Sequence, residues 1–201
     1  MCFMIRLLLL FILISSISFS QVPNYVPSNG LVGWWPFNGN ANDESVNTNN
    51  GTVNSATLTS DRFGNSNSAY DFDGIDDWID ILVSGASSGN FEATLNAWFQ
   101  INNTSNVVSY IVSYGNFNGP LGSVFGMGEY GSSGMFTTFS GGQFDAISQI
   151  QCPLNNWHMM TAKHLTNGQI EIYLDAILIH SQSVSTPNIP APIAGGRIGR
   201  A

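Results

Sequence analysis

The chain has 201 residues with 13 acidic side chains and five Lys or Arg, and its formal net charge of −8 argues against binding to the phosphate backbone of nucleic acid. Charged residues make up only 9% of the chain, so Asn, Ser, Thr and Gly supply most of its polarity, a composition typical of turns and of hydroxylated strand faces. The length suits one domain with a sizeable core, and the acidic balance suits cation binding or simple solubility.

The first 20 residues have the layout of a secretory signal peptide. Arg6 precedes an unbroken apolar run from Leu7 to Ile14. In Ser18-Phe19-Ser20, the two serines are small residues at the positions that determine signal-peptide cleavage. We expect removal before Gln21 and a secreted or cell-surface protein without a membrane span. The alternative is a membrane anchor, but serines interrupt the run well before the roughly 20 apolar residues that a spanning helix needs.

Export leaves Cys152 as the single cysteine, so the mature domain has no internal disulfide. We interpret Cys152 as a semi-buried thiol rather than a nucleophile, because no cysteine–histidine pairing at a known spacing accompanies it.

Beyond the leader, apolar residues alternate with polar ones in short runs, and turn signals separate the runs. This pattern predicts an all-β, antiparallel sandwich in a single domain over residues 21–201. In chain order, we expect strands at Leu31 to Phe37, Ala69 to Phe72, Trp78 to Val83, Ala93 to Ile101, Tyr110 to Tyr114, Ser123 to Met127, Met135 to Phe139, Trp157 to His164 and Gln169 to His180.

Two of these runs show their faces clearly. In Ala93 to Ile101, the positions of Leu95 and Phe99 predict an apolar face, and Trp98 points to the opposite side. In Gln169 to Ala176, Ile170, Ile172, Leu174 and Ala176 form the apolar face, and Glu171, Tyr173 and Asp175 lie opposite. The Asn167-Gly168 pair between two alternating runs predicts a hairpin, because Asn-Gly readily takes the positive φ of its turn.

Several blocks together resemble a known family. LVGWWPFNGNANDES, DRFGNSNSAYDFDGIDDWIDI, ATLNAWFQI, NNWHMMTAKHL and QIEIYLDAILIHS occur in the order and spacing of bacterial laminin G-like domains of the concanavalin A-like lectin/glucanase superfamily. The resemblance runs from Gly30 to Gly199 and implies a jelly-roll β-sandwich. The sequence departs from the family at three positions where Gly is frequent, which are here Val46, Thr48 and Ala176. The family's closing strand after Ile-Gly-Arg has no counterpart in this sequence, so we expect a truncated piece of a longer protein with further domains.

A glycan or another surface ligand needs aromatic faces for stacking and polar groups for its hydroxyls. Strand alternation makes Trp98 and Tyr173 the candidate ligand-binding residues, with Trp34 as a third if Trp35 and Phe37 face inward and Tyr130 as a further possibility. The alternative for each aromatic is a place in the core, since sandwich strands can be covered on both sides.

For a metal, the resemblance points to Asp43 as a ligand of a structural Ca²⁺, with Asn42 and Glu44 as neighbouring oxygen donors. The run from Asp71 to Asp77 resembles a calcium loop at first sight, but it lacks the Glu that an EF-hand requires at its twelfth position. A strand–turn–strand with Asp73-Gly74 as the turn is the better interpretation.

Glucanases share this fold and use two carboxylates, often within an E-x-D-x-x-E strand. None of the mature glutamates, at 44, 92, 129 and 171, starts such a motif, so we expect no catalytic residues. His158 and His164 are interpreted as packing or rim residues. The sequence therefore predicts an exported, non-catalytic binding module for carbohydrate or a surface ligand; the alternatives are a structural or cell-adhesion spacer and an accessory part of a glycoside hydrolase.

Overall fold

The computed structural model describes residues 22–104, 108–139, 144–185 and 188–200. The predicted signal peptide lies outside these ranges. The named elements of the described residues are strands and the 3₁₀ turn η1 (Gly131–Ser133), and these residues hold no helix long and apolar enough to span a membrane. In chain order the strands are β1 (Gly51–Asn54), β2 (Thr57–Thr59), β3 (Ala69–Asp71), β4 (Trp78–Ile81), β5 (Ala93–Phe99), β6 (Ser109–Gly115), β7 (Val124–Tyr130), β8 (Met135–Phe139), β9 (Ala146–Gln151), β10 (His158–His164), β11 (Gln169–Leu174), β12 (Ile177–Ser183) and β13 (Gly195–Arg200).

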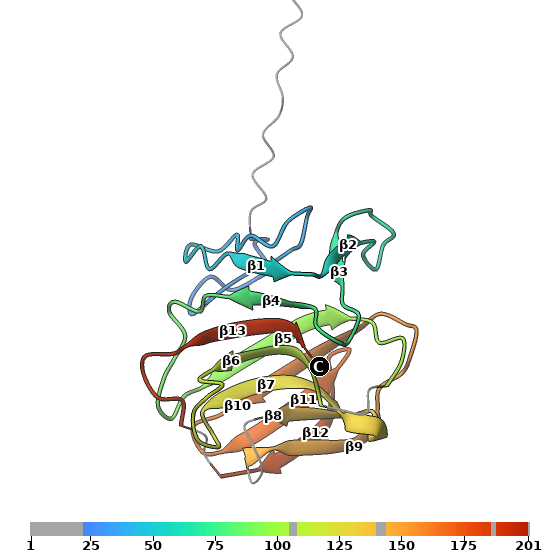
Figure 1. The fold of residues 1–201 in the computed structure, drawn as a ribbon. Helices are drawn as coiled ribbons and strands as arrows, with labels where there is room; N and C mark the ends of the chain where they lie inside the picture. The colour runs from blue at the N-terminus through green and yellow to red at the C-terminus, as the bar shows by residue number, and fades with distance from the viewer. Residues whose placement is uncertain (1–21, 105–107, 140–143, 186–187, 201) are drawn as a thin grey trace, which may run out of the picture.

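Two antiparallel sheets pack face to face, and a small third sheet sits at one end (Figure 1). The larger sheet has the order β1-β4-β13-β6-β7-β8-β9, the smaller has the order β12-β11-β10-β5, and β2 pairs with β3. Strand β13 lies between β4 and β6, so the C-terminal segment is built into the larger sheet beside strands that come much earlier in the chain. This is the predicted all-β jelly-roll sandwich.

The main core fills the space between the two sheets. Strand β11 contributes Ile170 and Ile172 from one side, and β7 contributes Phe125 and Met127 from the other, all of them 0% exposed. In β5 the side chains of Leu95 and Phe99 pack against this cluster, as the alternation predicts. Because apolar residues occupy every second position of these strands, each strand is left with a second face that points away from the core.

A second, smaller cluster lies under the N-terminal segment. Ile79 and Ile81 of β4 are buried there, with Trp35 and Phe37 packed against them. The Phe37 ring meets the Tyr70 ring edge-on, with centroids 5.1 Å apart. Trp35 and Phe37 therefore face inward, which is the condition under which Trp34 became a candidate ligand-binding residue.

The prediction of a strand at Leu31 to Phe37 is wrong. The main chain of this segment bonds to a neighbouring loop instead of a ladder partner: Trp34 N donates to the Asp43 carboxylate and Trp34 O accepts from Glu44 N. Phe37 ends the segment with φ of 59°, a left-handed conformation that a strand does not contain.

The prediction of one strand over Gln169 to His180 is also wrong. The chain reverses at Asp175 and Ala176, whose φ values are 49° and 66°, and forms a hairpin of β11 and β12. Two positive φ angles at the central positions match a type I′ hairpin turn. Ala176 is therefore an exposed turn residue and not part of an apolar strand face. The hairpin predicted at Asn167-Gly168 is confirmed, since it connects β10 to β11 and Gly168 has φ of 80°.

Candidate functional site

The outer face of the four-stranded sheet carries two of the three predicted ligand-binding aromatics. Trp98 on β5 lies opposite Met159 on β10, and Tyr173 on β11 lies opposite Thr161 on the same central strand. Asn96 is the other neighbour of Thr161, so an amide and a hydroxyl lie between the two rings. Both aromatics point away from the core, as the alternation predicts.

Tyr173 is held in a small polar cluster on this face. Its hydroxyl donates to Glu171 Oε2 at 2.7 Å, and the Lys163 ammonium lies 5.1 Å from its ring centroid and 3.4 Å from the same Glu171 oxygen. The hydrogen bonds from Tyr173 and Lys163 hold the pKa of Glu171 below its usual range, and the bond to Glu171 raises the pKa of Tyr173. The ring is thus fixed in orientation, while its surroundings stay polar.

The Trp98 side chain is 43% exposed, and the guanidinium of Arg62 packs against its ring. The Arg62 guanidinium lies 4.3 Å from the Trp98 ring centroid and also 4.3 Å from the Phe63 ring centroid. Arg62 and Phe63 belong to the connection between β2 and β3, which this stacking ties to β5. Sequence reasoning missed Arg62, because no pattern at a separation of 36 residues indicates that this loop reaches the sheet.

Trp34 is not part of this face. It belongs to the irregular segment beside the smaller cluster, where its main chain bonds to residues 43 and 44 and its side chain is half-buried. The structure therefore brings Trp98 and Tyr173 onto one sheet and leaves Trp34 elsewhere. Its role in binding stays a prediction.

Asp43 is 5% exposed and organises the loop that follows the WWPF segment. Its Oδ1 accepts hydrogen bonds from Trp34 N at 2.7 Å and Ser45 N at 2.8 Å, and its Oδ2 accepts from Ser45 Oγ and Asn49 N, both at 2.7 Å. A carboxylate has about four acceptor positions. All four are used by protein donors, so this carboxylate does not fit a cation ligand in the arrangement described.

Glu44, the neighbour of Asp43, differs in this respect. Its Oε2 is buried and has no hydrogen-bond partner among the described residues. The loop therefore still contains a carboxylate oxygen that is not committed to a protein donor. Whether the chain binds Ca²⁺ with Asp43 as a ligand stays a prediction, and Glu44 Oε2 is a neighbouring oxygen that no protein donor occupies.

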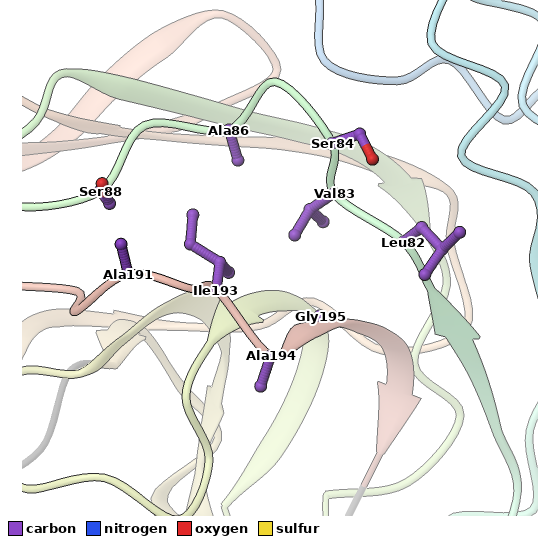
Figure 2. Close-up of a pocket in the computed structure, with 9 residues that line it drawn as sticks. All are labelled: Leu82, Val83, Ser84, Ala86, Ser88, Ala191, Ile193, Ala194 and Gly195. Carbon is purple, nitrogen blue, oxygen red and sulfur yellow. The ribbon is translucent and has the colours of Figure 1, made fainter.

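A cleft of about 300 Å³ lies at the end of the sandwich, between the β4–β5 connection and the segment that leads into β13 (Figure 2). Small and aliphatic side chains line it, from residues 82–88 on one side and 191–195 on the other. The lining contains no aromatic ring and no charged group. It lacks the stacking surface that a sugar requires, so we regard the sheet face as the better candidate site.

Three residues of types that can perform acid–base or nucleophilic chemistry, His158, His164 and Cys152, are held by a structural contact or by burial. His158 Nδ1 lies 2.7 Å from Asp175 Oδ2, and Met159 N donates to the other Asp175 oxygen at 2.9 Å, which lowers the pKa of Asp175. His164 is fully buried, with Nδ1 2.6 Å from Phe91 O. Burial, with the nearby Glu129 charge, raises the pKa of the Cys152 thiol to about 12, so this thiol is a poor nucleophile at neutral pH.

Comparison with known proteins identifies the family and the fold. The Laminin_G_3 family, described as the concanavalin A-like lectin/glucanases superfamily, matches residues 73–201. A search of curated proteins found no match.

Among solved structures, domain 4 of AbnA, a GH43 extracellular arabinanase from Geobacillus stearothermophilus in complex with arabinotriose, is 15% identical, with a TM-score of 0.63 over 83% of this chain and 81% of that one. Trypanosoma rangeli sialidase is 17% identical, with a TM-score of 0.59 over 87% of this chain and 28% of that one. The ligand binding domain of botulinum neurotoxin serotype D, in complex with N-acetylneuraminic acid, is 13% identical, with a TM-score of 0.58 over 78% of this chain and 39% of that one. At these identities the likeness shows the shared jelly-roll fold.

Proposed function

Because the chain belongs to the Laminin_G_3 family of the concanavalin A-like lectin/glucanase superfamily, we propose that it is an exported, non-catalytic module that binds glycans on the outer face of its four-stranded sheet. The observation that carries this proposal is the row of Asn96, Thr161 and Tyr173 across β5, β10 and β11, with Trp98 two residues further along β5 on the same face. The signal peptide predicted at residues 1–20 supports the exported location.

The row has the chemistry that a sugar chain needs. A sugar ring presents a C–H face that packs on an aromatic ring, and its hydroxyls bond to amide and hydroxyl groups such as those of Asn96 and Thr161. Trp98 and Tyr173 lie two strands and one row apart, which places their Cα atoms about 12 Å from each other. A single monosaccharide is too short to reach both rings, so we expect an oligosaccharide that runs obliquely across the sheet.

Arg62 belongs to the same site. Its guanidinium covers part of the Trp98 indole and supplies hydrogen-bond donors at that end of the row. Tyr173, whose neighbours are Glu171 and Lys163, forms the other end. The site therefore has an aromatic group and a charged group at each end, with neutral polar groups between them.

Two of the similar structures support a glycan as the ligand. Domain 4 of the arabinanase was solved with arabinotriose and the neurotoxin domain with N-acetylneuraminic acid. Both share the fold of this chain, and neither identifies the sugar that this chain takes.

The proposal is tested by pull-down of the purified protein with a panel of polysaccharides. Tyr173→Ala and Trp98→Ala should each weaken binding about tenfold or more, because each removes the aromatic contact at one end of the site. Tyr25→Ala is the matched control, since Tyr25 is 78% exposed and lies outside the sheets. Unchanged binding in both sheet variants, with the wild-type protein bound, would contradict the site. Absence of binding to every polysaccharide would favour an adhesion spacer.

A further inference from the structure

The outer face of the seven-stranded sheet carries a separate ion pair flanked by aromatic rings. Asp80 on β4 lies directly opposite Arg197 on β13, and Arg197 lies opposite Ser113 on β6. Ser113 is buried, whereas the side chains of Asp80 and Arg197 are 48% and 25% exposed. The part of this row that solvent reaches is therefore the charged pair.

The Arg197 guanidinium is hydrogen-bonded through Nε, and its Nη edge is open. Its Nε donates to Asp80 Oδ1 at 3.1 Å, and its guanidinium lies 4.8 Å from the Phe117 ring centroid and 6.0 Å from the Trp78 ring centroid. Among the described residues, the two Nη groups make no further hydrogen bond. A guanidinium fixed through Nε and packed by rings presents its Nη groups, with their four N–H donors, in a rigid fork.

The Asp80 carboxylate holds the Arg197 guanidinium in position and is itself held by two other donors. Its Oδ2 accepts from Trp78 Nε1 at 2.9 Å and from Asn54 Nδ2 at 3.2 Å, while Oδ1 takes Arg197. Burial alone would raise the pKa of Asp80, but the bonds from Trp78 and Arg197 outweigh it and hold that pKa below its usual range. Asp80 therefore stays ionised at neutral pH and keeps Arg197 in one orientation.

We propose that the cluster of Arg197, Asp80, Trp78 and Phe117 is a second ligand site, which binds the carboxylate of an acidic sugar residue. The Nη edge of a guanidinium matches a carboxylate with two parallel hydrogen bonds, and the two flanking rings offer faces for the C–H groups of the sugar ring. A singly charged carboxylate is favoured over a phosphate, because Asp80 and the net charge of −8 repel a dianion more strongly.

The other cations whose side chains the structure describes are arranged differently. Lys163 is paired with Glu171, and Arg62 lies between the Phe63 and Trp98 rings on the opposite side of the sandwich. Arg197 alone of the three combines a fixed Nε with an open Nη edge on the larger sheet. The second site does not depend on the glycan face proposed above, so either can fail without the other.

Isothermal titration with an oligogalacturonate and with its fully methyl-esterified form tests this site. The wild-type protein should bind the acid form at least tenfold more tightly than the ester, and Arg197→Gln should abolish that preference, because a charge-assisted bidentate pair is lost. Tyr25→Ala, at an exposed position outside both sheets, is the control variant and should leave the preference intact. Equal affinity for acid and ester, or an unchanged preference in Arg197→Gln, would overturn the proposal.

A measurement on the wild-type protein covers the case in which Arg197→Gln does not fold. In a ¹⁵N NMR titration, the acid form should shift the Trp78 indole N–H and the Arg197 Nε–H resonances, and the ester should shift them far less. Shifts confined to Trp98 and Tyr173 would overturn the second site and leave the glycan proposal standing. Shifts confined to Trp78 and Arg197 would support the second site, and the glycan face would still be tested by the polysaccharide pull-down.

Discussion

Replacing Asp43 with Ala removes the acceptor of four hydrogen bonds at once. The donors are three backbone N–H groups, of Trp34, Ser45 and Asn49, and the Ser45 hydroxyl, around a carboxylate that is only 5% exposed. A hydrogen bond to a charged group contributes roughly 1.5–3 kcal/mol to stability. In the alanine variant water can enter the loop and accept from the freed donors, so we expect a loss of about 1 kcal/mol for each hydrogen bond. The free energy of unfolding should fall by about 4 kcal/mol.

Asp43→Asn is the graded companion of this change. The amide keeps one oxygen and turns an NH₂ toward the other two donors, so we expect a loss of about 2 kcal/mol. Urea unfolding followed by tryptophan fluorescence measures both variants, and thermal unfolding should place the alanine variant roughly 10 °C below the wild type. A loss below 1 kcal/mol for Asp43→Ala would refute the hydrogen-bond account.

A chelator separates this account from a metal site at Asp43. If the hydrogen bonds carry the stability, EDTA changes neither the wild-type curve nor the size of the Asp43→Ala effect. If EDTA instead lowers the wild-type stability to that of Asp43→Ala and leaves the variant unchanged, Asp43 acts through a cation and the reasoning from its four donors is refuted.

Three further predictions follow from single positions. Ala176→Gly should raise the free energy of unfolding by about 1 kcal/mol in urea, since glycine adopts the φ of 66° found there without strain, and a decrease would contradict the turn. Ile172→Ala, at a fully buried position, should cost about 3 kcal/mol in the same assay, whereas Ile177→Ala, at a 68% exposed position, should cost less than about 0.5 kcal/mol. Burial lowers the pKa of His164 in the folded state, although the Phe91 carbonyl and the Glu92 charge act in the opposite direction. The free energy of unfolding should therefore be greatest above about pH 6.5 and should fall at lower pH, because the unfolded chain takes up a proton on His164 more readily. His164→Leu should lessen that fall.

The sequence predicted the sheets well wherever one strand face is buried. Alternation in β5 and β11 determines which side chains meet the core, so the outward direction of Trp98 and Tyr173 follows from the pattern alone. Trp35 and Phe37 also face inward, although their segment is not a strand. A period of two residues is a local property, and it survives in the folded chain because the core imposes it.

Features set by side chains distant in the sequence were not predictable. The segment Leu31 to Phe37 alternates like a strand, but the Asp43 carboxylate takes the Trp34 N–H that a ladder would need. Arg62 reaches Trp98 across 36 residues, and Arg197 reaches Asp80 across 117. No local period encodes such contacts, because the first depends on where the β2–β3 connection lies and the second on β13 pairing with β4 in the sheet.

The most direct test of glycan binding is a glycan array probed in parallel with the wild-type protein and the double variant Trp98→Ala/Tyr173→Ala. Both rings point outward, so the double variant should keep the wild-type melting temperature within a few degrees. The account predicts that the wild type binds a defined set of oligosaccharides and that the double variant loses this set. Retention of the same set by a folded double variant would contradict the assignment of the four-stranded face as the binding site.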